Sequence, residues 1–197
     1  MTTAITTRST KGSALTFTEM DTNFDTLAIQ SIWIPAGAMY PSSTNPCSAL
    51  TQVETTALRP DLKVLDFDPS SDEFAQFSIV WPNSWDKSTI TFKAFFTVTG
   101  TNTGSVAWGL AGVAITDDET INTAFPTPTV ATAKSHSGTS NDLNVTAESG
   151  AVTISGAGDD ELTFFNIQRD TDDDNQTGDA RLLGIQIFYT TDAANDA

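Results

Sequence analysis

The chain has 197 residues and a mass of 21.0 kDa, which corresponds to one domain or to one domain with a small appendage. Its 9 Lys and Arg against 25 Asp and Glu give a net charge of −16, which argues against binding to nucleic-acid phosphates or to anionic membranes. No apolar run reaches about 18 residues, so we expect no membrane span, and the first residues lack the apolar stretch of an ordinary secretory signal. The single cysteine, Cys47, excludes an internal disulfide.

The N-terminal segment is a small basic arm followed by a helix. Arg8 and Lys11 are the only charged residues among the first 18. Residues 16–28 read TFTEMDTNFDTLA, in which Thr16 and Glu19 match a capping box. The apolar residues of this segment fall on one helical face, which consists of Phe17, Met20, Phe24, Leu27 and Ala28. An isolated helix of about 12 residues is marginal in water, so we expect this one to be stable only when its apolar stripe is docked.

The rest of the chain has the pattern of a β-protein. Residues 35–60 contain four prolines and predict loops, whereas from residue 62 onward apolar and polar residues alternate with a period of two. About nine or ten short strands are expected. They include 31–34, 62–67, 77–81, 89–99, 106–110, 143–147, 152–154, 162–168 and 183–189. We therefore predict an all-β, jelly-roll-like antiparallel β-sandwich over residues 31–197, preceded by an extended arm and one short helix over residues 1–30.

Two of the predicted strands are apolar on both faces. Phe95 is adjacent to Phe96, and Phe164 is adjacent to Phe165, so one ring of each pair points away from the core. An outward apolar side chain needs either a covering loop, for which the segment 35–60 is available, or a subunit interface such as that of a homotrimer.

The run Asp170-Thr171-Asp172-Asp173-Asp174-Asn175 concentrates negative charge. Spaced carboxylates in a loop suit calcium, and Asp170, Asp172 and Asp174 are the candidate ligands. The spacing does not fit an EF-hand, because its glycine position would be Asn175. The alternative is a solvated tip between two strands, with Arg169 and Arg181 as counter-ions. Apart from this possible calcium site, no cofactor is expected.

No catalytic constellation stands out. His136, in SHSGTS, could be combined with Ser135, Ser137 or Ser140, but no nucleophile-elbow sequence is present, and we expect a solvated loop histidine. Acidic residues are numerous enough that a glycosidase pair is not excluded by counting. A sugar-stacking platform is a further possibility, formed by Trp33, Trp81, Trp85 and Trp108. Tryptophans at alternating positions are more often core residues.

Residues 11–27, KGSALTFTEMDTNFDTL, resemble a short motif near the N-termini of tailed-bacteriophage fibre and other virion structural proteins. The matching residues are Lys11, Gly12, Leu15, Thr16, Glu19, Met20, Asp21, Asn23, Phe24 and Leu27. A vaguer resemblance to β-sandwich virion proteins extends over most of the chain, including IWIPAGAMYPS, LTFFNIQRD and ARLLGIQIFY.

This resemblance implies a non-enzymatic structural component of a phage virion, such as a head decoration, a head fibre or a short tail fibre. The N-terminal segment would bind capsid or tail proteins, and the β-domain would project outward, often as a homotrimer. The partner-binding residues would be Leu15, Phe17, Met20, Asn23, Phe24 and Leu27. The alternative is a host-surface glycan-binding module, that is, a receptor-binding protein.

Overall fold

The computed structural model describes residues 5–158 and 160–192, and within this range it leaves the side chains of residues 25–27 undescribed. Two helices, α1 (Arg8–Lys11) and α2 (Phe17–Ala28), precede the body, and a short 3-10 turn, η1 (Ala36–Ala38), follows the first strand. The strands are β1 (Ile29–Pro35), β2 (Tyr40–Pro41), β3 (Thr51–Glu54), β4 (Asp61–Phe67), β5 (Glu73–Val80), β6 (Thr91–Val98), β7 (Ser105–Val106), β8 (Trp108–Ile115), β9 (Thr129–Val130), β10 (Lys134–Ser135), β11 (Asn144–Val145), β12 (Ile154–Ser155), β13 (Leu162–Arg169) and β14 (Ala180–Thr190). Within the described residues, no helix has both the length and the apolar character needed to cross a membrane.

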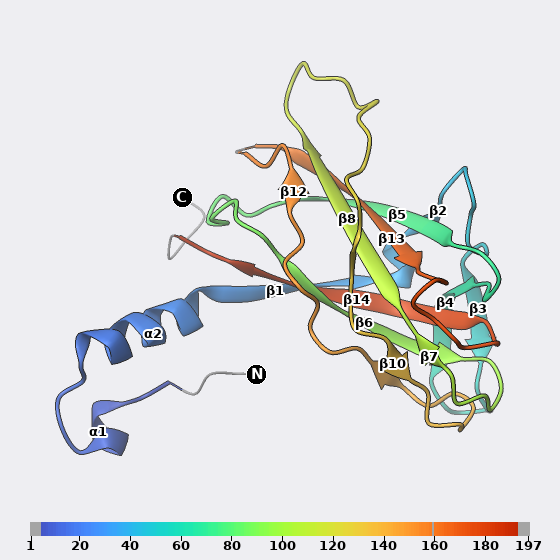
Figure 1. The fold of residues 1–197 in the computed structure, drawn as a ribbon, viewed down its shortest axis with the longest axis horizontal. Helices are drawn as coiled ribbons and strands as arrows, with labels where there is room; N and C mark the ends of the chain where they lie inside the picture. Colours follow the sequence, from blue (N-terminus) through green and yellow to red (C-terminus); the bar gives the residue numbers. More distant parts are fainter. Residues whose placement is uncertain (1–4, 159, 193–197) are drawn as a thin grey trace.

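The strands form two facing sheets (Figure 1). The first, which we call sheet A, has the order β11-β6-β14-β4-β3, and β1 also pairs with β14. The second, sheet B, has the order β12-β8-β13-β5-β2, and β9 also pairs with β8. Nearly all the pairings are antiparallel, β12 with β8 being parallel. A separate pair joins β10 to β7.

Successive strands cross repeatedly between the sheets, because β4 lies in sheet A, β5 in sheet B, β6 in sheet A and β8 in sheet B. This alternation confirms the predicted all-β, jelly-roll-like sandwich. The core fills the space between the sheets with large apolar side chains, among them Phe67, Phe77, Phe92, Phe96, Trp108, Phe165 and Ile187, all essentially buried. The period-two pattern of the sequence therefore identified the inward face of β6 correctly, but it was wrong over residues 143–147, where Asn144 and Thr146 are buried and Leu143 is 63% exposed.

The segment 35–60 does not lie over either outward apolar face. Its strand β2 pairs with the β5 edge of sheet B, and β3 pairs with the β4 edge of sheet A. Between them Cys47 is buried, and its backbone N–H donates to the carbonyl of Phe74 at 3.3 Å. The segment thus closes one side of the sandwich, and the expectation that it covers Phe95 and Phe164 is not supported.

The N-terminal helix leaves the sandwich instead of packing on it (Figure 1). Its start confirms the predicted capping box: the Thr16 hydroxyl accepts from the Glu19 backbone N–H at 3.2 Å, and the Glu19 carboxylate accepts from the Thr16 N–H at 2.7 Å. The helix passes directly into β1 at Ile29, which pairs with Thr190. Strand pairing therefore begins two residues before the expected body at residue 31.

Candidate functional site

The outward surface of sheet A carries an exposed aromatic group among polar side chains. Trp33 on β1 is 48% exposed and contacts Phe95 on β6 edge to face, with ring centroids 5.0 Å apart at 85°. The indole lies directly over Gly184 of β14. A side chain at that position would place its Cβ only 2.7 Å from a Trp33 ring carbon. Because Gly184 has no side chain, there is room for the indole to pack against the sheet at this position.

Polar groups surround this aromatic pair. The Gln186 side-chain amide donates to the Ser31 hydroxyl at 3.0 Å. Lys93 Nζ lies 5.1 Å from the centroid of the Phe188 ring and 3.9 Å from a Glu148 carboxylate oxygen. We call this surface the Trp33 face; it consists of Ser31, Trp33, Lys93, Phe95, Gln186 and Phe188. It combines an aromatic surface with amide, ammonium and hydroxyl groups, and it is built on paired strands rather than on loops.

The other candidate tryptophans belong to the core. Trp81 and Trp85 stack with ring centroids 4.4 Å apart, and both are buried. Trp108 is fully buried against Phe67. The four tryptophans therefore do not form one platform, and Trp33 alone among them is exposed.

Two of the expected partner-binding residues, both phenylalanines of α2, are strongly exposed. Phe17 is 83% exposed and Phe24 is 69% exposed, whereas Leu15 and Met20 are partly buried. Asn23 ties the arm to the helix: its amide donates to the Thr6 carbonyl at 2.8 Å, and its oxygen accepts from the Thr6 N–H at 2.9 Å. The side chain of Leu27 lies outside the described part of the structure.

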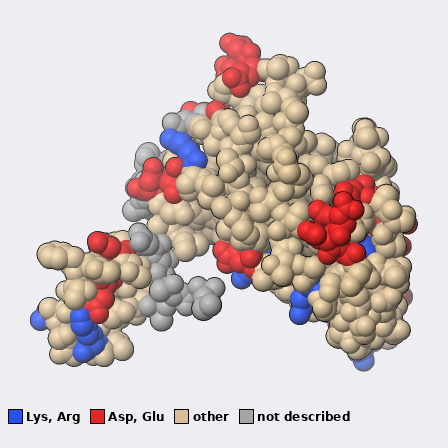
Figure 2. All heavy atoms as spheres, in the orientation of Figure 1, with Lys and Arg blue, Asp and Glu red and all other residues tan. Residues whose placement is uncertain are grey.

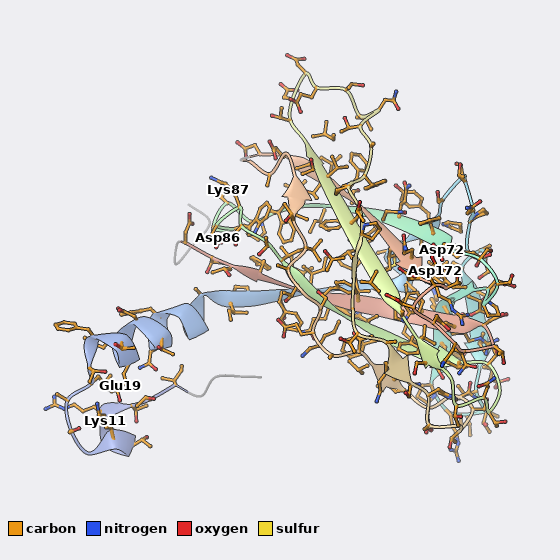
Figure 3. All side chains as sticks on the ribbon, in the orientation of Figure 1. Lys11, Glu19, Asp72, Asp86, Lys87 and Asp172 are labelled. Carbon is orange, nitrogen blue, oxygen red and sulfur yellow. The ribbon has the colours of Figure 1, made fainter. Side chains whose placement is uncertain are left out.

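Glu19 also joins the two helices. Its carboxylate bonds to the Lys11 ammonium, and Figure 3 shows the two side chains facing each other between α1 and α2. The hydrogen bond from Lys11 and those from the Thr16 backbone and hydroxyl lower the pKa of Glu19 to about 2. The arm and α2 therefore form one small unit, with Phe17 and Phe24 exposed on it.

The acidic run does not assemble as a calcium site. Asp174 binds the buried Arg169 through two contacts, Nε to Oδ2 at 2.8 Å and Nη2 to Oδ1 at 3.0 Å. Asp170 instead accepts the backbone N–H groups of Asp172 and Asp173 at 3.2 and 3.3 Å. Across residues 5–158 and 160–192, no group of three or more His, Cys, Asp or Glu is arranged to hold a metal ion.

This part of the chain is the loop between β13 and β14, as the alternative predicted, and Arg169 is one of the expected counter-ions. Arg181, the other, pairs with Asp66 at 3.2 Å.

Sequence reasoning missed Asp72, which accepts both the N–H and the hydroxyl of Thr171 at 2.9 and 2.8 Å. Asp72 and Asp172 lie at the same end of the sandwich (Figure 3), where Figure 2 shows acidic side chains gathered. Burial and the charges of Asp72 and Asp173 raise the pKa of Asp170.

His136 is buried rather than solvated, which corrects the expectation for it. Its Nδ1 lies 2.7 Å from the Asn102 carbonyl. The neighbouring hydroxyls have other partners: Ser135 bonds to the Ser105 hydroxyl at 2.8 Å, and Ser137 donates to Asp142 at 2.6 Å. Cys47 is also buried, and this burial raises the pKa of its thiol to about 12.

No family model and no curated protein matches this chain. Solved structures similar to it include a family 35 carbohydrate binding module from Clostridium thermocellum, at 9% identity and a TM-score of 0.45 over 80% of this chain and 97% of that one. The CBM27-1 of Caldicellulosiruptor saccharolyticus in complex with mannohexaose matches at 10% identity and a TM-score of 0.41 over 80% and 96%. An arabinose-bound MgGH51 α-L-arabinofuranosidase matches at 16% identity and a TM-score of 0.45 over 77% of this chain and 23% of that one. At these identities and scores the likeness says nothing about the ligand of this chain.

Proposed function

We propose that this protein is a non-catalytic binding protein whose sandwich recognises a glycan through the Trp33 face. The observation that carries the proposal is the half-exposed indole of Trp33, held over Gly184 and against Phe95. A rigid aromatic surface gives a sugar ring an apolar contact, and the adjacent amide and ammonium groups can bond to its hydroxyls.

Binding is favoured over catalysis by where the candidate reactive groups lie. His136 and Cys47 are buried, and Asp174 is bound to Arg169. The carboxylate of Glu148, which lies beside the Trp33 face 3.9 Å from Lys93 Nζ, already accepts the Thr91 hydroxyl at 2.6 Å. A glycosidase of the usual kind needs two carboxyl groups flanking the scissile bond.

The glycan proposal is tested on an array of bacterial surface polysaccharides, with Trp33→Ala as the informative variant. Full burial of an aromatic side chain contributes about 1.5–3 kcal/mol, and a ligand can cover only the exposed half of Trp33, so we expect about a three- to tenfold loss of affinity. Tyr40→Ala is the matched control, because Tyr40 is an equally exposed aromatic residue at the edge of sheet B. Equal binding by wild type and Trp33→Ala, or no binding by the wild type to any glycan, would refute the proposal.

A second role, compatible with the first, is that of a structural component of a phage virion attached through the N-terminal helix. The observation that favours it is that α2 leaves the sandwich with Phe17 and Phe24 exposed. Exposed apolar groups on a helix of about 12 residues indicate a partner, because such a helix gains most of its stability from docking.

The attachment role is tested by deleting residues 1–28 and, in the full chain, by the double substitution Phe17→Ser/Phe24→Ser. Both proteins should keep the unfolding transition of the wild-type sandwich and fail to join particles in a co-assembly assay. Loss of the sandwich transition in the deletion variant would mean that the helix contributes to its own core, and normal incorporation of either variant would refute the attachment role.

A further inference from the structure

The first strand of the sandwich leaves one of its edges unpaired. β1 pairs with β14 along one side, and no strand within the described residues pairs with its other side. The Ala28 carbonyl accepts from the Thr191 N–H at 2.8 Å, and the Ile34 carbonyl lies against Gly184, so the even-numbered positions bond to β14. Because the direction of hydrogen bonding alternates along a strand, the odd-numbered residues of β1 direct their N–H and carbonyl groups to the unpaired edge. Pro35, which has no N–H, occupies one of these odd-numbered positions.

This edge lacks the features that usually keep strand edges from associating. The other described strands at the edges of sheets A and B are only two to four residues long, whereas β1 has seven. Its sequence, IQSIWIP, contains no charged residue, and its proline stands at the last position. An exposed edge of this length without charge is a template for pairing with another strand. In a chain of net charge −16, it is also a segment at which two copies can approach with little repulsion.

The side chains at the odd-numbered positions favour a second β1 as the added strand. Ile29 is 56% exposed, Trp33 is 48% exposed, and the exposed Ser31 lies midway between them on the same outward face. If two β1 strands pair antiparallel about Ser31, Ile29 of each copy lies directly opposite Trp33 of the other. Each of these two contacts covers a pair of apolar side chains that are exposed in the single chain. The backbone groups of the three residues would form about six hydrogen bonds between the copies.

We propose that the unpaired edge of β1 binds β1 of a second copy, so that the two copies of sheet A join into one continuous antiparallel sheet. The contact uses the same surface on both copies and closes a dimer, not the homotrimer that the resemblance implies. In the dimer both Trp33 faces point to the same side, and Ile29 of each copy adjoins Trp33 of the other. This extension of the aromatic surface bears on glycan binding only if the proposed function holds, whereas the strand pairing does not depend on it.

Sedimentation velocity of the full-length protein, without any glycan, tests the pairing. We expect the wild type to dimerise at micromolar concentration and Ile29→Glu to dimerise about tenfold more weakly, because a carboxylate would replace the apolar contact with Trp33 in both pairs. Ser31→Pro removes an outward N–H and leaves the bonds to β14 intact, so it should weaken the dimer to a similar extent. Val80→Glu is the matched control: it places the same charge on an exposed apolar residue of sheet B and should dimerise as the wild type does. A wild type that stays monomeric, or equal weakening in Val80→Glu and Ile29→Glu, would overturn the proposal.

A cross-link tests the register of the two strands. Two Ser31 residues that form a hydrogen-bonded pair at the two-fold axis would have Cα atoms about 5.5 Å apart, which is within the range of a disulfide. Ser31→Cys should therefore give a disulfide-linked dimer under mild oxidation, and Cys47 does not compete because it is buried. Ser78→Cys, at an exposed serine of β5, is the matched control and should remain monomeric on a non-reducing gel. Equal cross-linking of the two variants, or none in Ser31→Cys, would show that β1 does not pair with itself in this way.

Discussion

Replacing Arg169 with methionine should destabilise the sandwich more than any change to a surface ion pair. Arg169 is fully buried, and its guanidinium donates five hydrogen bonds. Two go to Asp174, and the others go to the carbonyls of Phe67 at 2.9 Å, Gly178 at 3.0 Å and Gln176 at 2.6 Å. The side chain thus links β4, the end of β13 and the loop that leads to β14.

The magnitude follows from what the substitution leaves behind. The side chain of Asp174 is only 3% exposed, so Arg169→Met would leave a buried carboxylate without its counter-ion. Breaking one side of a buried pair costs about 3–5 kcal/mol, which is a large part of the 5–15 kcal/mol that stabilises a typical domain. Arg169→Met/Asp174→Leu removes both charges, so it should recover part of the loss.

Urea unfolding followed by tryptophan fluorescence measures these changes, since Trp108 lies in the same core. Arg181→Met is the matched control: Arg181 pairs with Asp66, and both side chains are about one-fifth exposed. Because this pair is still partly solvated, that variant should lose clearly less stability than Arg169→Met. Equal losses in Arg169→Met and Arg181→Met would refute the reasoning, and so would a double variant that is less stable than Arg169→Met.

Two further predictions concern charge. Glu19 should titrate near pH 2 by NMR, and Lys11→Met should raise the pKa of Glu19 towards 4.5. Because folding lowers this pKa, the ionised Glu19 stabilises the α1–α2 unit fully above about pH 4.5, and this stabilisation is lost as the pH falls through about 2. An ordinary Glu19 titration would contradict the bond to Lys11. The thermal midpoint should rise from low salt to roughly seawater ionic strength with any monovalent salt, because screening relieves self-repulsion in a chain of net charge −16. A rise seen only with millimolar calcium, and abolished when Asp170, Asp172 and Asp174 are replaced by Asn, would contradict simple screening.

The features that sequence predicted well are those determined by near neighbours. Thr16 and Glu19, which form the capping box, are three positions apart, so the geometry of the box follows once a helix forms. The period-two pattern of β6 likewise identified its inward residues, because alternation alone determines which side chains share a face. In β14 the pattern held for Ile185, Ile187 and Tyr189, but a register shift between Leu182 and Gly184 buries Leu182 instead of the expected Leu183.

What sequence could not supply depends on contacts between distant segments. His136 is buried because its ring meets the Asn102 carbonyl, 34 positions earlier, in a loop packing that no local pattern encodes. Trp33 and Trp81 occupy similar alternating patterns, yet only Trp33 faces outward, since burial depends on which face the opposite sheet covers. Asp174 looked like a metal ligand because the sequence does not reveal that the Arg169 side chain turns inward to bind it.

The continuity of α2 with β1 also has a mechanical consequence. β1 runs antiparallel to β14 over seven residue pairs, from Ile29 with Thr190 to Pro35 with Gly184. A pull on the N-terminal helix is therefore directed along β1, parallel to the strand axis and perpendicular to the hydrogen bonds that join it to β14. In this shear geometry the bonds of the ladder share the load and must break together, whereas a strand peeled from one end loses them one at a time. If the protein were tethered by its first 28 residues and dragged by flow or by a bound cell, the force would pass from β1 to β14, the strand at the centre of sheet A.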